Sequence, residues 1–467
     1  MTSPLHFRSL SALVDAMRSG TLSVQEVTEH HLKRIAELEP KLHAFAVVRA
    51  DEARAEAREA DARRKRGDVL GPLHGAPIAV KDLCAMAGTR TGAGGFFPTG
   101  FAADQTATVV RRLQNAGAII IGKAQLTEGA WGSHHPDIPA PVNPWAPHRW
   151  SGSSSSGSGV SVAAGMVTGA IGTDTAGSIR YPSAANGIVG LKPTWGRVSR
   201  HGVFPLSDTF DHVGPMARTV PDAALMFAAI AGPDANDPTA LDVPSADWTG
   251  AANNGSLKNL RIGVDQKYTF GSVDPVMADA FRTALDVCAK HGAHIVDIEV
   301  PPVDQILELA IIGAMAEAAI SHARTYPSNR KSYSATYAEL LEIGHRATGI
   351  EIARLAIWRR EFAGGLSAVF KSVDVMATPV LPVQPLMVAE MDALSAAPPL
   401  ASAPFLKFTI PFNLASVPTL TLPAKRLPDG TPLAFQLIGP ALGEAAIFSA
   451  GGAFERASGF AAAHPQI

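Results

Sequence analysis

The chain has 467 residues, of which 46% are hydrophobic and 18% are charged, with a formal net charge of −2 at pH 7. This composition is typical of a compact globular protein, and the small net charge removes any bulk electrostatic argument for nucleic acid or an anionic membrane as a partner. Two cysteines, Cys84 and Cys288, are too few for a disulfide framework and indicate a reducing, cytoplasmic location.

The N-terminal part of the chain is expected to be mainly helical over residues 1–66. Ser23 followed by Glu26 is a capping-box pattern, and residues 49–66 are rich in Ala, Glu and Arg. These charges are typical of a solvated helix face. Residues 1–20 contain no continuous apolar run, and no stretch of the chain approaches the ~20 apolar residues that cross a bilayer, so we expect neither a signal peptide nor a membrane anchor.

Short apolar strands then alternate with helices. The runs at 77–80 and 118–121 predict buried strands, with a helix at about 107–115 between them. The same alternation returns in the second half of the chain, which indicates an α/β protein with a parallel or mixed sheet covered by helices on both faces. A segment rich in Pro, Asp, Asn and Gly at 232–258 is expected to be a long surface loop, and a proline-rich loop is expected at 377–404.

Several familiar motifs are incomplete. Residues 117–124, GAIIIGKA, nearly match a phosphate-binding loop but lack the final Ser or Thr, so a buried strand and turn fit better. No serine between 151 and 183 stands in a G-x-S-x-G frame, and the adjacent His134 and His135 lack zinc-ligand spacing. Cys84 is more typical of a small packing residue than of an activated thiol. We expect no metal and no cofactor.

Lys81 is the first candidate for chemistry, because it follows the apolar run Pro-Ile-Ala-Val at 77–80. Burial disfavours the charged form of a lysine, so a desolvated lysine titrates near neutrality and acts as a base. The alternative is an ordinary ion pair with a carboxylate such as the neighbouring Asp82. Taken alone, the segment favours the ion pair.

The second candidate is a tract of small residues that starts with SGSSSSGSG at 151–159 and continues to GTDTAGS at 172–178. Small residues let successive backbone N–H groups point into one concavity, which binds an anion. Ser178 at the end of this segment would hold a nucleophilic hydroxyl beside those donors. A glycine-rich connection to a strand explains the spacing equally well.

Together these segments resemble the amidase signature family. The match comprises the V-K-D context of Lys81, the serine/glycine tract, GTDTAGSIRYPSA at 172–184 and GIVGLKPTWGRVS at 187–199. The resemblance extends from about residue 8 to 457 and is weaker at 235–350. It implies a single α/β domain over 1–467, a mixed sheet of around eleven strands flanked by helices, a signature core at 77–220, and a cofactor-free amidohydrolase.

The resemblance also implies a Ser-Ser-Lys triad. Ser178 corresponds to the nucleophile that becomes the acyl-enzyme, Ser154 to a bridging serine that follows a cis peptide bond, and Lys81 to the base. The oxyanion hole corresponds to the backbone amides of Thr175, Ala176, Gly177 and Ser178. Asp174 and Arg180 are expected to hold the loop as an ion pair. The family usually has glycine at three positions that are Ser153, Ser156 and Ala176 here, which leaves the donor geometry open.

The substrate is less determined. A small-molecule amide is expected, with Trp131 and Ser155 as candidate substrate contacts; a packed core tryptophan is an equal alternative for Trp131. One family branch is the glutaminase subunit of a tRNA-dependent amidotransferase, and it usually has Gln where this chain has Tyr181. That branch is the first alternative. A non-catalytic scaffold of the same fold is the second. Homodimers are common among relatives.

Overall fold

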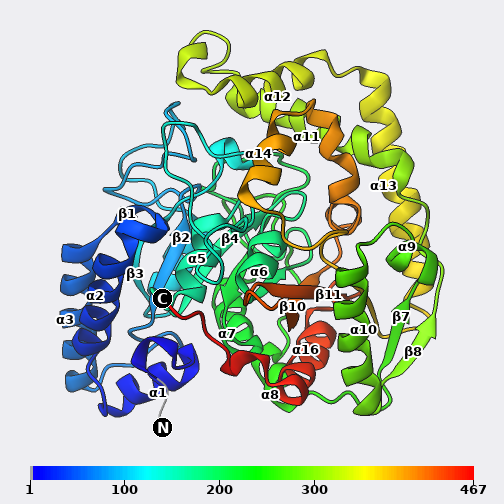
Figure 1. Cartoon of the computed structure of the whole chain (residues 1–467). Helices are drawn as coiled ribbons and strands as arrows, with labels where there is room; N and C mark the ends of the chain where they lie inside the picture. The colour runs from blue at the N-terminus through cyan, green and yellow to red at the C-terminus, as the bar shows by residue number, and fades with distance from the viewer. Residues whose placement is uncertain (1–3) are drawn as a thin grey trace.

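A single mixed sheet of eleven strands crosses the computed structural model, which describes residues 4–467 (Figure 1). Residues 1–3 of the predicted helical N-terminal part lie outside the described residues. The strand order is β1-β3-β2-β4-β6-β5-β10-β11-β9-β7-β8. The α/β class and the strand number agree with the resemblance. The strands are β1 (Phe45–Val48), β2 (Pro77–Lys81), β3 (Ile119–Ala124), β4 (Gly169–Asp174), β5 (Val189–Lys192), β6 (His212–Ala217), β7 (Arg261–Val264), β8 (His294–Asp297), β9 (Val375–Pro379), β10 (Thr419–Arg426) and β11 (Pro432–Ile438).

Helices cover both faces of this sheet. Strand β4 shows the two sides: a side chain at Gly169 would meet Met226, whereas one at Gly172 would meet Ser155 and Ile179. Met226 lies in α7, which packs with α8 and α16, while Ser155 and Ile179 precede α5 and α6 on the opposite face. The helices of these two layers are α5 (Ser156–Ala163), α6 (Arg180–Asn186), α7 (Val220–Ile230), α8 (Trp248–Asn254), α10 (Pro275–Lys290) and α16 (Glu444–Ser458).

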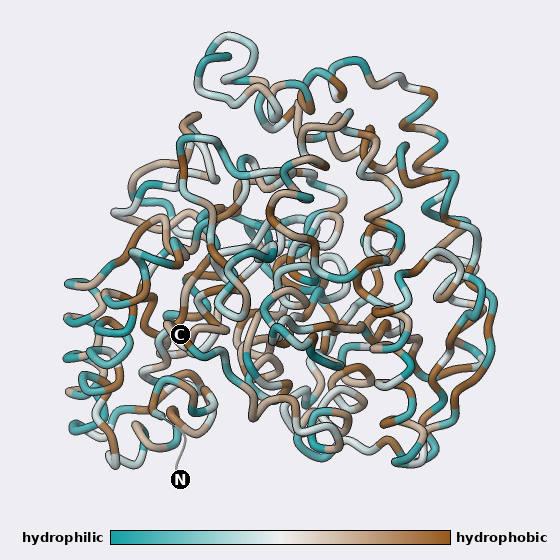
Figure 2. The backbone as a smooth tube through the Cα atoms, in the orientation of Figure 1, coloured by the Kyte–Doolittle hydropathy of each residue, from teal (hydrophilic) through white to brown (hydrophobic). Residues whose placement is uncertain are grey.

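The remaining helices surround these two layers. At one end α2 and α3 pack against each other, and above the sheet α11 packs against α12 and α13 (Figure 1). The outer helices alternate between hydrophilic and hydrophobic residues, as helices with one buried face do (Figure 2). These helices are α1 (Leu10–Ser19), α2 (Val24–Leu42), α3 (Ala50–Arg66), α4 (Thr108–Asn115), α9 (Gln266–Phe270), α11 (Leu307–His322), α12 (Ala335–Arg346), α13 (Gly349–Val369), α14 (Val388–Ala396) and α15 (Ile410–Leu414).

The N-terminal part is mainly helical, with β1 between α2 and α3. The predicted capping box is present at the start of α2: the Ser23 hydroxyl accepts from the Glu26 N–H at 3.0 Å, and the Glu26 carboxylate accepts from the Ser23 N–H at 2.7 Å. Residues 117–124 are not a phosphate-binding loop, because they run into the fully buried strand β3.

Both predicted long loops contain regular structure. Residues 232–247 are irregular, but α8 follows within the predicted loop and buries Trp248. The predicted loop at 377–404 begins inside β9, contains α14 and ends in a 3₁₀ segment, η5 (Pro399–Leu406). The prolines indicated a loop, but they flank a run of Ala, Leu, Met and Glu, which are strong helix formers.

One helical stretch, Asp304–His322, is long and apolar enough to cross a membrane, which the sequence analysis did not expect. Its apolar side chains Ala310, Ile311, Ala314 and Met315 are fully buried within the protein. Burial of this kind is typical of a core helix, so this stretch is weak support for a membrane span.

Candidate active site

Lys81 is the last residue of β2 and is completely buried. Its Nζ donates to Ser154 Oγ at 2.6 Å and to Thr173 Oγ1 at 2.8 Å. Burial lowers the pKa of Lys81 from 10.5 to about 7, although the charges of Asp211 and Asp174 act in the opposite direction. The uncharged amine is therefore accessible near neutral pH.

Asp82 does not pair with Lys81. Its carboxylate contacts Lys123 Nζ at 2.6 Å, and both side chains are buried. Consecutive residues of an extended segment point to opposite sides, so Asp82 turns away from the amine that precedes it. The ion pair that the sequence favoured for Lys81 is therefore wrong, and Lys81 is left with two hydroxyl partners.

Ser154 lies in the loop before α5, and the Ser153–Ser154 peptide bond is cis, as the resemblance implied. Ser155 does not line the adjacent cavity, contrary to its predicted contact with substrate. It is fully buried, and its hydroxyl donates to the Thr173 carbonyl at 3.2 Å and accepts from the Thr173 N–H at 3.3 Å. Ser153 lines the cavity instead.

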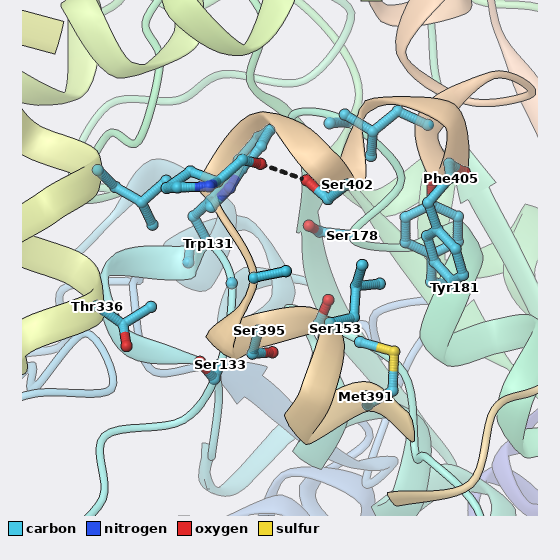
Figure 3. A pocket seen from close by; sticks show the side chains of 18 of the residues that line it. Trp131, Ser133, Ser153, Ser178, Tyr181, Thr336, Met391, Ser395, Ser402 and Phe405 are labelled. Carbon is cyan, nitrogen blue, oxygen red and sulfur yellow. Dashed lines mark hydrogen bonds between the residues drawn. The ribbon is translucent and has the colours of Figure 1, made fainter. Parts of the chain in front are cut away.

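Ser178 follows the turn after β4, and its side chain is at the cavity (Figure 3). Its carbonyl accepts from the Ser155 N–H at 3.2 Å, which holds the two serine segments side by side. Of the predicted relay, the hydrogen bond between Lys81 and Ser154 is formed. Within residues 4–467, no hydrogen bond joins the Ser154 and Ser178 hydroxyls. Catalytic hydrogen bonds are often long before substrate binds.

The turn 175–178 carries the predicted oxyanion donors. The Gly177 N–H is already used, because it donates to Asp174 Oδ1 at 2.8 Å. The N–H groups of Thr175, Ala176 and Ser178 have no acceptor in the part of the chain that the structure describes. Gly177 has a φ of 130°, which favours glycine, whereas Ser153, Ser156 and Ala176 are absent from the residues with positive φ. The three replaced glycines therefore impose no backbone strain.

Asp174 and Arg180 form the predicted ion pair beneath this turn. Arg180 Nη2 lies 2.8 Å from Asp174 Oδ1, and both side chains are fully buried. Arg180 Nη1 also donates to the Thr409 carbonyl at 2.9 Å, and Asn413 Nδ2 donates to Asp174 Oδ1 at 2.9 Å. These hydrogen bonds thus connect the turn that carries Ser178 to Thr409 and Asn413, which lie far along the chain.

Sequence reasoning missed Asp211, which lies directly before β6. Thr175 Oγ1 donates to Asp211 Oδ1 at 2.5 Å, and Asp211 Oδ2 accepts from the N–H groups of Leu206 and Ser207 at 2.9 and 3.1 Å. Burial raises the pKa of Asp211 to about 6. No sequence signal identifies this contact, because it depends on which strand lies beside β4.

The cavity at Ser178 has a volume of about 100 Å³ and is lined mostly by apolar side chains. Trp131 lies on one side of Ser178, and Tyr181 and Phe405 lie on the other (Figure 3). Trp131 is therefore a cavity-lining residue as well as a packed one. The large apolar lining residues are Trp131, Trp150, Tyr181, Leu340, Met391, Leu394, Phe405 and Leu406.

A larger cavity of about 970 Å³ lies beyond this one, and Leu394 and Phe405 border both. It contains neither Ser178 nor any other predicted catalytic residue. Cys84 also takes no part in the site, since burial raises the pKa of its thiol to about 12. The smaller cavity is therefore the candidate active site.

Comparison with known proteins identifies the family of the chain. The sequence profile of the Amidase family matches residues 26–448. The chain is 40% identical over 461 residues to a putative amidase, AmiD, of Mycobacterium tuberculosis (98% of this chain, 96% of the relative). It is 37% identical over 489 residues to a glutamyl-tRNA(Gln) amidotransferase subunit of Chloroflexus aggregans, with 99% of both chains covered.

Among solved structures, a bacterial aryl acylamidase of the amidase signature family superposes with a TM-score of 0.87, at 25% identity, over 98% of each chain. The profile match and the identity to curated relatives both extend over nearly the whole length of the chain. The chain therefore belongs to the amidase signature family and is an enzyme that hydrolyses the amide C–N bond.

Proposed function

We propose that this enzyme hydrolyses a small-molecule carboxylic amide through an acyl-Ser178 intermediate, with Ser154 and Lys81 as its proton relay. The observation that carries the proposal is the buried Lys81 amine, 2.6 Å from Ser154 Oγ, with a pKa of about 7. A charged lysine is unable to accept a proton, so the lowered pKa makes this amine usable as a base.

In the first half of the reaction, neutral Lys81 takes the Ser154 hydroxyl proton while Ser154 takes the proton of Ser178. The Ser178 oxygen attacks the amide carbon, and the carbonyl oxygen becomes an oxyanion. The proton then returns from Lys81 through Ser154 to the amide nitrogen, the C–N bond breaks, and the amine leaves. Water attacks the acyl-Ser178 ester by the same route, which releases the carboxylic acid and restores the serine.

The oxyanion would be stabilised by the backbone donors of the turn 175–178. The free N–H groups of Thr175, Ala176 and Ser178 support this role, whereas the Gly177 N–H is occupied by Asp174. Preorganised donors of this kind contribute roughly 3–4 kcal/mol each to the transition state. We therefore assign Gly177 to the shape of the turn, since its φ of 130° suits glycine.

Covalent labelling tests the nucleophile. A fluorophosphonate probe should modify Ser178, and Ser178→Ala should abolish the labelling. Ser133→Ala is a matched control, because Ser133 lines the same cavity, and it should label normally. Labelling that is unchanged in Ser178→Ala would remove the nucleophile assignment.

A second candidate function is the glutaminase subunit of a tRNA-dependent amidotransferase, favoured by the 37% identity to a chain of such an enzyme. It predicts glutamine hydrolysis and stable association with partner subunits, whereas the amidase proposal predicts turnover of other amides by the chain alone.

The reactive groups present at Lys81, Ser154 and Ser178 argue against a non-catalytic scaffold. We expect a cytoplasmic enzyme, and size-exclusion chromatography would show whether the chain is a monomer or a homodimer.

A further inference from the structure

The lining of the Ser178 cavity contains no Asp, Glu, Lys, Arg or His side chain among the described residues. Two carboxylates close in sequence to lining residues are engaged elsewhere: Asp174 binds Arg180, and Glu128 accepts from the Ser334 N–H at 3.0 Å. An ionised group on the substrate would therefore enter the cavity without a partner, at a cost of several kcal/mol. Free glutamine carries two such groups beside its amide.

Apart from the indoles of Trp131 and Trp150, the polar side chains of the lining are neutral hydroxyls. The Ser402 hydroxyl, one of them, donates to the Pro399 carbonyl at 2.9 Å (Figure 3). The Tyr181 hydroxyl lies 2.5 Å from Thr409 Oγ1 and donates to the Phe405 carbonyl at 3.2 Å. Tyr181 thus uses its polar end outside the cavity and contributes its ring to the wall.

Aromatic rings stand on both sides of the nucleophile. Tyr181 packs against Phe405 with ring centroids 5.5 Å apart, and Trp150 packs against both at 6.0 and 5.8 Å. Trp131 faces this group across Ser178 (Figure 3). An engineered apolar cavity of ~150 Å³ holds benzene, so an open pocket of about 100 Å³ suits one ring or a short branched chain.

We propose that the acyl group accepted here is uncharged and apolar, of about the size of one aromatic ring, and lies between Trp131 and Phe405. This inference rests on the proposed function, because it assumes acyl transfer to Ser178. Flat rings on two sides favour a planar group by offset or edge contacts. Glutamine is excluded as a good substrate by the same argument.

Para-substituted benzamides test the charge requirement at constant shape. Ammonia release should show kcat/KM for 4-methylbenzamide at least about a hundredfold above that for 4-carboxybenzamide or glutamine, because the carboxylate has no partner. Hydrolysis of either charged amide within about tenfold of 4-methylbenzamide would overturn the inference. Fluorophosphonate labelling of the same preparation separates the two proposals: labelled Ser178 with a preference for charged amides refutes only the substrate class, whereas unlabelled, inactive protein refutes both.

Phe405→Ala tests whether the Phe405 ring contacts the acyl group of the substrate. It should lower kcat/KM for 4-methylbenzamide by about tenfold or more and change that for propionamide less, because only the larger group loses the ring contact. Phe370→Ala is the control, since Phe370 is also half-buried but lies outside the cavity. Equal losses for both amides, or equal losses in the two variants, would contradict the role of Phe405.

Discussion

At the scale of single residues, the candidate chemistry depends on the surroundings of one amine. Burial takes water away from Lys81, and its two close partners are hydroxyl groups. The only carboxylate next to it in sequence, Asp82, is held by Lys123. A lysine paired with a neighbouring carboxylate stays protonated, because the negative charge raises its pKa. The pairing of Asp82 with Lys123 is therefore as important for the proposed base as the burial of Lys81.

The lowered pKa of Lys81 predicts a pH dependence. The uncharged amine is the active form, so kcat/KM should rise with pH, reach half its maximum near pH 7 and level off above about pH 8. Lys81→Ala should reduce the acylation rate by about a thousandfold with unchanged circular dichroism. Stopped-flow burst kinetics between pH 5.5 and 9 measure both effects. A flat profile, or near-normal turnover by the variant, would contradict the base assignment.

Residues with strong local context were predictable, and residues that meet only in the folded chain were not. The apolar run before Lys81 indicated its burial, and the Asp174–Arg180 ion pair was expected together with the family resemblance. Thr173 and Asp211 gave no signal, because their contacts come from neighbouring strands. Ser155 was misassigned: its hydroxyl faces β4, and neighbouring Ser153 faces the cavity.

At the scale of elements, the register of β4 on β6 explains how the turn 175–178 is held. The two strands are antiparallel with Asp174 opposite His212, so the next residues outward, Thr175 and Asp211, face each other. The resulting hydrogen bond of 2.5 Å fixes the first residue of the turn. The pairing of β4 with β6 thus helps to position the backbone N–H groups of the turn 175–178, although this turn lies outside both strands.

Asp211→Asn should therefore lower kcat by about tenfold to a hundredfold with little change in KM, because displaced donors weaken transition-state binding. It should also move the pH midpoint of kcat/KM downward, since the Asp211 charge raises the Lys81 pKa. Thr175→Val removes the same hydrogen bond but keeps the carboxylate, so it should lower kcat without the downward shift. Identical pH profiles for wild type and Asp211→Asn would contradict this positioning role.

Helices and strands were predicted correctly where the local sequence signals did not conflict with one another. The capping box at Ser23 and Glu26 marked the start of α2, and apolar runs marked β2 and β3. Prolines misled the prediction at 377–404, where α14 fits between them. The missed helix matters, because Met391 and Leu394 of α14 line the candidate site.

At the scale of the whole molecule, Arg180 connects two distant parts of the chain. It bridges Asp174 to Thr409 and Gln436, and it also contacts Asn413. The sequence alone did not give the strand order that brings these parts together, because pairing of β5 with β10 is a long-range contact. The family resemblance supplied the strand number, and the structure supplied the order.

Breaking this connection should destabilise the whole fold. Arg180→Met leaves Asp174 charged and buried, which should cost about 3–5 kcal/mol of unfolding free energy. Arg261→Met is the control, because Arg261 pairs with Asp374 at 2.7 Å on the surface, with 45% and 36% of the side chains exposed. It should cost less than about 1 kcal/mol. Urea unfolding followed by circular dichroism measures both, and similar midpoints for the two variants would contradict the assignment.

The strand order also has a consequence for biosynthesis. The nucleophile and its turn emerge from the ribosome early, but β5 gains its second neighbour only when β10 has been made, more than 220 residues later. Arg180 likewise waits for Thr409 and Asn413 before its guanidinium is satisfied. A nascent chain thus carries all three residues of the proposed triad long before the strand pairing and the Arg180 contacts around them are complete.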